Sequence, residues 1–410
     1  MSANLISTRD SMARSAVKTA SGVAVLPQHQ ASNSFVPASE VVRTFTANTQ
    51  GQWGSYSEWT LTADQMPDVV DNLVLQMTIG AATKTGGSVI SFVNDGAFLN
   101  RLVEVYVGAE LVTSMYPESQ YINRVLHTTA EGKTLTLKAL GNDAVATRRT
   151  NAAAGHTLYI PISLPWISKY GFFTKSFGSQ LRLRVHHATL ADVAQTDGTA
   201  PVCVINAVAL QVSGRSYLNQ ANVGALVAQQ RKNGKNDERF VDPLQQQITL
   251  PSGSTSYTVQ LTNFQGIFDS IFFVVRAAAS VGTPLANDPD AFVAVASFSL
   301  LDGAGNIILP ATTSAYALGP YLAKYISGDG KDNDDASQKY IYPIFFGNRP
   351  EETLFKGTQH GLHRFDGTHK LVITFASALA AGYVIDVVGR VFSNLSADSN
   401  GVIKKSLVTA

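Results

Sequence analysis

The chain has 410 residues, enough for about two to four domains of ordinary size, and 45% of them are hydrophobic, which suffices to bury a core. Only 15% are charged, against about 25% in an average soluble domain, and 31 Lys and Arg nearly cancel 30 Asp and Glu. This composition excludes a disordered chain, a long coiled coil and an acidic tail, and it argues against a dedicated nucleic-acid binder.

The sequence also carries little sign of membrane insertion or export. Its longest nearly uninterrupted apolar run, Ala291 to Leu301, is shorter than the roughly 18 to 20 residues that a spanning helix needs. The N-terminus lacks the apolar core of a signal peptide, and the single cysteine, Cys203, cannot form an intrachain disulfide. We therefore expect no transmembrane segment and no export by a signal peptide.

Residues 1–40 are rich in Ser, Ala, Thr and Gln and have few aromatics. Arg9, Arg14 and Lys18 are spaced along this segment, with Asp10 as the only acidic residue near them. Such a composition predicts a mobile N-terminal arm. Leu5, Ile6, Met12, Ala13 and Val17 could form one loose helical stripe beside the cations, able to touch a membrane surface or a partner.

From about Glu40 the sequence changes to short β-branched and aromatic segments separated by Gly, Asn, Asp and Ser clusters. This pattern predicts an all-β fold of the sandwich or barrel type. In Gln180 to Val185 apolar and polar residues alternate, so that strand is expected to have one wet face. The strands we predict are Val41 to Ala47, Leu73 to Ile79, Leu102 to Val107, Leu158 to Ile162, Leu181 to His186, Val202 to Val212, Tyr257 to Leu261, Ile271 to Arg276, Val293 to Leu301, Tyr340 to Phe346, Leu371 to Phe375 and Val384 to Phe392.

Two segments have helical spacing instead, Glu118 to Leu126 and Ser314 to Ile326, although Gly319 and Pro320 would kink the second. They occupy comparable places in two halves of the chain. Each half contains a hairpin, a helix, a strand with Tyr-Ile-Pro or Tyr-Pro-Ile, an alternating strand and a long last strand, in the same order. This repeat predicts a duplicated antiparallel sandwich.

The repeat sets the expected boundaries. We predict an N-terminal arm over 1–40, a first sandwich over 41–215, a linker over 216–240, a second sandwich over 241–395 and a C-terminal tail over 396–410. The linker holds Arg231, Lys232 and Lys235, followed at once by Asp237 and Glu238, and this mixture of charges favours a solvated connector over a phosphate site.

Candidate chemical sites are few. His360, His363 and His369 with Asp366 form the densest group of potential metal ligands, but they contain neither a His-x-His pair nor the His-Glu-x-x-His motif of zinc enzymes. The acidic group Asp329, Asp332, Asp334 and Asp335 lacks the spacing of a calcium loop. His186 and His187 end an alternating strand and should point to opposite faces.

Three further features of the sequence also indicate no chemical site. Cys203 lies in an apolar strand, no nucleophile or phosphate-binding motif occurs, and Asn394 to Ser396 matches the glycosylation pattern without a secretory signal. We therefore predict no catalytic, cofactor or metal site.

Two stretches carry a family resemblance. In the first, the run Ser91 to Arg101 leads into Val103 to Gly108; in the second, Leu158 to Trp166 leads into Leu181 to Val185. They resemble the double jelly-roll major capsid proteins of icosahedral, often membrane-containing viruses, in which a strand ending in an Ile/Val-Gly turn precedes a helix and then a Tyr-Ile/Val-Pro-Leu/Ile strand. The second half departs from this pattern, because Tyr342 to Phe346 lacks the Trp.

The resemblance implies an all-β fold of two tandem eight-stranded jelly-roll β-sandwiches with short inserted helices. It implies a structural protein without enzymatic activity, cofactor or small-molecule substrate. Its partners would be two further copies in a pseudo-hexameric homotrimer, neighbouring capsomers, and minor capsid or vertex proteins. The arm would contact an internal membrane or the genome, and the protein would reside in the virion shell after assembly inside the host cell.

Two other classes remain open at this point. Jelly rolls also serve as carbohydrate- or receptor-binding modules of the spike or lectin type, although Trp53, Trp59 and Trp166 are scattered along the chain. A metal-dependent, cupin-like enzyme would use the same fold, but its His-x-His ligand pair is missing.

Overall fold

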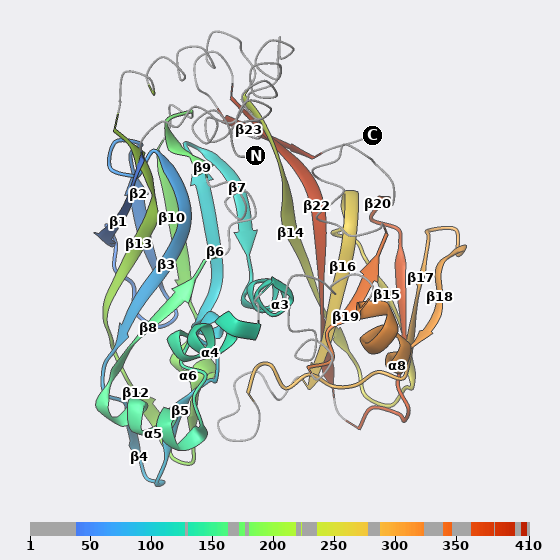
Figure 1. Cartoon of the computed structure of the whole chain (residues 1–410). Helices are drawn as coiled ribbons and strands as arrows, with labels where there is room; N and C mark the ends of the chain where they lie inside the picture. The colour runs from blue at the N-terminus through green and yellow to red at the C-terminus, as the bar shows by residue number, and fades with distance from the viewer. Residues whose placement is uncertain are drawn as a thin grey trace, which may run out of the picture.

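The computed structural model describes residues 38–127, 130–162, 172–176, 180–218, 223, 236–277, 288–323, 339–346, 362–380, 382–397 and 403–407. Two β-sandwiches stand side by side, the first built from the N-terminal half of the chain and the second from the C-terminal half (Figure 1). No described helix is long and apolar enough to cross a membrane.

The first sandwich consists of two antiparallel sheets. Sheet A has the strand order β1-β13-β3-β8, with the short β9 (Phe172–Phe173) also paired to β3, and sheet B has the order β2-β10-β6-β7. The strands are β1 (Ala38–Thr46), β2 (Tyr56–Leu61), β3 (Val69–Ile79), β6 (Asn100–Val107), β7 (Glu110–Met115), β8 (His156–Pro161), β10 (Leu181–His187) and β13 (Ile205–Tyr217).

The second sandwich repeats this plan. Sheet C has the order β14-β22-β16-β19, with β20 (His363–Asp366) paired to β16 and β23 (Ile403–Leu407) paired to β22, and sheet D has the order β15-β21-β17-β18. The strands are β14 (Asn236–Leu250), β15 (Ser256–Gln260), β16 (Gln265–Ala277), β17 (Ser297–Leu301), β18 (Ile307–Thr313), β19 (Tyr342–Phe345), β21 (Lys370–Thr374) and β22 (Tyr383–Ala397).

The two sandwiches have the same topology. When the eight long strands of each are numbered along the chain, one sheet reads 1-8-3-6 and the other 2-7-4-5 in both halves. In this arrangement, the jelly roll, strands next to each other in sequence fall on opposite sheets, except for the fourth and fifth, which pair as a hairpin within one sheet. The prediction of two tandem eight-stranded jelly-roll sandwiches is confirmed.

Helices and short ribbons occupy the connections. The predicted helix at 118–126 is confirmed as α3 (Pro117–His127), and the second predicted helix starts as expected with α8 (Ser314–Tyr316). It continues only as η4 (Ala317–Tyr321), because the backbone leaves the helical region at Gly319 before Pro320. The sandwich strands β2 and β14 were not predicted. The helices and short strands of the connections that were not predicted are β4 (Thr83–Thr85), β5 (Ile90–Phe92), η1 (Gly96–Leu99), α4 (Ala130–Ala139), α5 (Val145–Ala154), η2 (Thr174–Ser176), α6 (Leu190–Val193), β11 (Ala194–Thr196) and β12 (Thr199–Val202).

Each sandwich encloses an apolar core made by the inward residues of its alternating strands. From Leu181 to His186 of β10 the apolar positions are buried and the polar ones are only partly covered, so the expected wet face is confirmed. In the second core the ring of Phe273 lies 4.9 Å from that of Phe298 and 5.0 Å from that of Tyr342. Edge-to-face and offset rings of this kind fill a sandwich interior efficiently.

Strand pairing extends into two segments that the sequence assigned to linker and tail. β14 begins at Asn236, and its residues pair one by one with β22 up to Ala397. β23 lies within the predicted tail and pairs with the end of β22, from Ser393 to Ala397. The β14–β22 pairing joins residues far apart in the chain, which local sequence patterns do not reveal, whereas β22 and β23 are near neighbours in sequence. The predicted arm up to residue 37 and most of the linker lie outside the described residues, and the last three arm residues, 38–40, belong to β1.

Candidate functional site

The candidate histidine group His360, His363 and His369 is only partly described. Nε2 of His363 lies 3.0 Å from Nε2 of His369, and Nδ1 of His369 lies 3.1 Å from a carboxylate oxygen of Asp366. The two rings stand among aromatics, with His369 packed on Phe365, and burial lowers the pKa of His363. These contacts describe hydrogen-bonded histidines. His360 and the acidic group from Asp329 to Asp335 lie outside the described residues.

His186 and His187 point to opposite faces of β10, as predicted. His186 contacts Glu104 at 2.9 Å on the wet face, whereas buried His187 contacts the Ser57 hydroxyl at 2.8 Å and Asn100 at 3.2 Å. Burial lowers the pKa of His187 to about 4, so its ring is neutral at physiological pH.

Cys203 is buried and donates its thiol hydrogen to the carbonyl of Gly80. Burial raises the pKa of this thiol, which is the opposite of what a nucleophilic thiolate needs. Across the described ranges, no three His, Cys, Asp or Glu side chains gather as a metal site would require.

The most extensively built site is the junction between the two sandwiches. The hydrophobic cluster of the first sandwich continues without a break into side chains of the second. The ring of Tyr121 on α3, for example, meets the ring of Phe292 edge to face at 5.8 Å. The side chains contributed by the second sandwich are Phe240, Phe272, Val274, Phe292, Leu322, Ile341, Phe345, Val388 and Leu395.

Sheet C is therefore covered on both faces. Along β16, Ile271, Phe273 and Val275 join the core of the second sandwich, while Phe272 and Val274 join the cluster of the first. This explains why β16 has a continuous apolar run where a one-sided strand would alternate. Because β16 is buried on both faces, it packs sheet C against sheet D on one side and against the first sandwich on the other.

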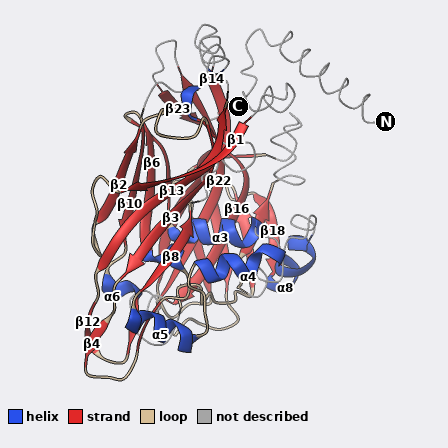
Figure 2. Cartoon of the chain, turned by 60° about the vertical axis from the view of Figure 1, so that its left-hand side comes forward, coloured by secondary structure: helices blue, strands red, loops and turns tan. Residues whose placement is uncertain are grey.

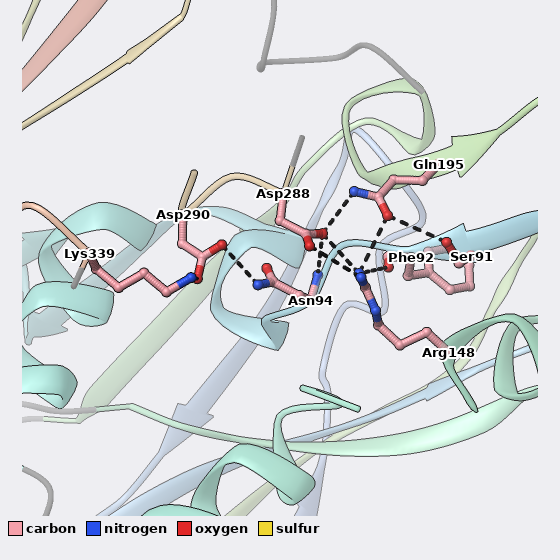
Figure 3. Close-up of polar contacts among 8 residues, drawn as sticks. All are labelled: Ser91, Phe92, Asn94, Arg148, Gln195, Asp288, Asp290 and Lys339. Carbon is pink, nitrogen blue, oxygen red and sulfur yellow. Dashed lines mark hydrogen bonds and ion pairs between the residues drawn. The ribbon is translucent and has the colours of Figure 1, made fainter. Parts of the chain in front are cut away.

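Polar side chains cross the same junction in three clusters. In the first, the segment 288–290 of the second sandwich reaches the first sandwich (Figure 3). The Arg148 guanidinium on α5 donates to both carboxylate oxygens of Asp288, at 2.8 and 3.2 Å. Gln195 donates to the same carboxylate at 2.9 Å, and the Arg148 side chain is 8% exposed.

Asp290 continues this cluster two residues later. Its carboxylate accepts hydrogen bonds from the Asn94 amide at 2.8 Å and from the Tyr121 hydroxyl at 3.0 Å, both in the first sandwich. Lys339 of the second sandwich pairs with it at 2.7 Å. Burial, and secondly the nearby carboxylates, raise the pKa of Tyr121 well above its ordinary value, so it stays a neutral donor.

The second cluster lies at the start of α3. Arg276 on β16 pairs with Glu118 on α3 at 2.5 Å and with Asp386 on β22 at 3.1 Å, and all three side chains are buried. Gln245 and Gln247 on β14 donate to the Asp386 carboxylate. Burial and the nearby Glu118 carboxylate raise the pKa of Asp386, since one guanidinium serves two carboxylates.

The third cluster involves the C-terminal strand. Asp242 on β14 accepts hydrogen bonds from Thr113 on β7 and from the Lys405 ammonium on β23. The backbone amide of Lys405 donates to the Glu110 carboxylate on β7 at 3.3 Å. β23 thus contacts both sandwiches. Burial raises the pKa of Asp242.

None of these junction residues was singled out from the sequence. Their partners lie far away in the chain, as with Arg148 and Asp288, and no motif joins them. The apolar run of β16 was the one signal that could have indicated a second buried face.

This architecture is similar to that of several solved structures. No protein-family model matches the chain, and no curated protein matches it in sequence. Solved structures do match. VP54 of PBCV-1, fitted into a reconstruction of the virophage Sputnik, gives a TM-score of 0.64 at 11% identity, over 91% of this chain and 98% of that one. The chain has the double jelly-roll fold.

Two further structures agree. The Faustovirus major capsid protein gives a TM-score of 0.64 at 8% identity, over 100% of this chain and 99% of that one. A chain of the cryo-EM structure of the Sputnik virophage gives 0.60 at 9% identity, over 91% and 89%. These matches span both sandwiches together, so the likeness includes the double jelly roll as a unit.

The junction provides this double jelly roll with a fixed geometry. Its apolar side chains are buried between the two sandwiches. Its polar clusters form only when particular side chains of the two sandwiches meet. The hydrogen bonds and ion pairs of these clusters join protein groups, either across the two sandwiches or within one of them. The arrangement serves to hold two sandwiches in one orientation, which is a structural role.

Replacing Arg276 by Met should lower the free energy of unfolding by about 3–5 kcal/mol, because Glu118 and Asp386 would then remain buried without their cation. Chemical denaturation of the full chain measures this. The matched control is Arg215→Met, since the Arg215–Asp71 pair is 42% and 39% exposed and should cost less than about 1 kcal/mol. Equal losses in the two variants would contradict the structural role of the cluster.

The raised pKa of Asp386 predicts a pH dependence of stability. Above about pH 4 an unfolded Asp has lost its proton while the folded chain still holds it, so stability should fall as pH rises until the folded group ionises. Asp386→Asn should make this fall shallower, by at most about 1.4 kcal/mol per pH unit.

Urea unfolding at several pH values measures the slope. Asp302→Asn is the control of opposite sign, because hydrogen bonds from Asn306 lower the pKa of Asp302. A slope that is unchanged in Asp386→Asn would contradict the prediction.

Proposed function

We propose that this chain is the major capsid protein of an icosahedral virus and resides in the virion shell after assembly inside the host cell. The observation that carries the proposal is the pair of sandwiches with identical strand order, held together by a buried junction. The full-length likeness in fold to the Faustovirus major capsid protein supports it. The role is structural and needs no substrate or cofactor.

We further propose that three copies form a pseudo-hexameric capsomer. Three chains with two similar sandwiches each present six similar blocks around one axis, which gives a nearly six-sided tile. Such tiles cover a surface when they contact neighbouring capsomers. Minor capsid or vertex proteins would complete the shell where the six-sided packing ends.

The carbohydrate-binding alternative finds less support. Sugar-binding sites commonly offer an exposed aromatic platform, but Trp59 is fully buried and donates its indole hydrogen to the Phe45 carbonyl. Trp53 is partly buried and stacks on Phe92 at 6.0 Å. Trp166 lies outside the described residues.

The N-terminal arm is proposed to lie on the inner side of the shell. β1 begins beside the end of β13, where Ala38 pairs with Tyr217, and β14 begins beside the end of β22. The start of β1, the end of β13, the start of β14 and the strand β23 therefore lie toward one end of the molecule (Figure 1). Arg9, Arg14 and Lys18 would meet anionic lipid or genome there, each adding on the order of 1 kcal/mol.

The purified full chain should behave as three copies in light scattering. The low charged fraction and the duplicated sandwich both favour association over a solitary monomer. Negative-stain microscopy should show six-lobed tiles. A monodisperse monomer at micromolar concentration that never assembles, even with other particle proteins, would contradict the capsid proposal.

Deletion of residues 2–20 should leave trimers intact and impair particle assembly or attachment to the inner layer. No described strand begins before Ala38, so the deletion removes no described strand pairing from the sandwiches. Light scattering, thermal melting and particle yield test this against the full chain. Loss of trimers or a much earlier melt would place the arm in the folded core.

A further inference from the structure

The outer face of sheet A is an extended surface that is uncharged except at one end. Its side chains follow from strand alternation and register, and none of them is buried. Val42 is 63% and Tyr159 40% exposed. The face consists of Val42, Thr44 and Thr46 on β1, Ser213, Gln211, Ala209 and Ala207 on β13, Asn72, Val74, Gln76 and Thr78 on β3, and Pro161, Tyr159 and Thr157 on β8.

Charged residues stand only at one end of this face, where Glu40, Asp71 and Arg215 lie. Figure 2 turns this side of the first sandwich forward. The outer face of sheet B, on the same sandwich, differs sharply, since Arg184 pairs there with Glu58 and Glu104. Interface centres are depleted in charge, whereas solvated faces are not.

The equivalent face in the second sandwich has a known partner. Sheet C has the same strand order as sheet A, and its outer face packs against β7 and α3 of the first sandwich. The correspondence between sheets A and C extends to individual residues. Arg276 and Thr78 are the penultimate residues of the third strand in each sandwich, and Arg276 is the residue that meets Glu118 on α3. Sheet A therefore exposes the surface that sheet C buries.

The complementary surface is exposed in the second sandwich. β18, α8 and η4 hold the places there that β7 and α3 hold in the first. From Ile307 to Ala323 the sequence contains no charged residue. Ile307 is 68% and Tyr316 54% exposed, whereas Ala317 and Leu322 are buried, so part of this apolar strand and turn faces outward among the described residues.

We infer that the uncharged outer face of sheet A binds the β18–α8–η4 surface of a second copy of this chain. The contact repeats, between chains, the junction that joins the two sandwiches within one chain. The contact is heterologous, because two different surfaces meet: sheet A of one copy and the β18–α8–η4 surface of the next. Such contacts form a closed ring when the rotation from copy to copy closes. The inference rests on the proposed function, in which three copies close the ring.

Three variants with the same substitution test the assignment. Ala207→Glu places a charge on the sheet A face, Ala311→Glu places one on β18, and Ala153→Glu places one on an exposed position of α5 as the control. All three positions are exposed in the single chain, so the fold itself should tolerate them. Association is measured on the full chain by sedimentation and mass photometry.

The first two variants should associate at least tenfold more weakly than the wild type and sediment as monomers where wild type and Ala153→Glu remain trimers. An equimolar mixture of Ala207→Glu and Ala311→Glu should form a one-to-one dimer, since one intact pair of surfaces remains. That dimer also shows that both variants are folded.

The other outcomes separate the two proposals. If wild type trimerises and both single variants still do so, the surface assignment is overturned and the capsid proposal stands. A mixture that stays monomeric, or that forms trimers, overturns the head-to-tail geometry. A wild type that remains monomeric under all conditions overturns both.

Discussion

The burial of both faces of sheet C is the constraint on which the rest of the structure depends. Phe273 and its inward neighbours fill the second core, while Phe272 and Val274 extend the first. A sheet with only one covered face would leave these aromatic and aliphatic side chains in water, at a cost of about 1.5–3 kcal/mol for each large one. The two jelly rolls are therefore parts of one folding unit rather than two domains on a flexible linker.

Apolar burial alone would not determine how the sandwiches are oriented, because it has little directionality. The three polar clusters supply that direction. They are spread along the junction, with Arg148 on α5, Glu118 on α3 and Lys405 on β23, and these elements lie at successive heights in Figure 1. A shifted or rotated sandwich would leave these buried charges without partners, which costs several kcal/mol for each group. The clusters thus specify one orientation even if their net contribution to stability is small.

Much of the fold could be predicted from sequence because its signals are local. Alternation identified strands such as β10, and the repeated order of elements indicated the duplication. The strands β2, β14 and β23 and the helices α4 and α5 were missed; β14 and β23 depend on pairing with β22, and the helices lack a strong apolar stripe. The junction residues could not be predicted for a related reason. An isolated Arg148 or Asp288 looks like any surface charge until the fold brings the two together across 140 residues of chain.

The contrast between Arg276 and Thr78 connects this junction to assembly. Both residues hold the same place in equivalent strands, yet one is a buried charge and the other an uncharged hydroxyl hydrogen-bonded to Thr157 at 3.0 Å. Within one chain the two sandwiches meet at a high effective concentration, so a junction containing buried charges still forms despite their desolvation. In the proposed trimer the corresponding contact must form between separate molecules, at the concentrations of the cell and without that advantage. An uncharged surface removes the desolvation cost of ions and lets copies associate through shape and apolar contact. The same topology can then serve two purposes: the charged version fixes the sandwiches within a chain, and the uncharged version joins chains.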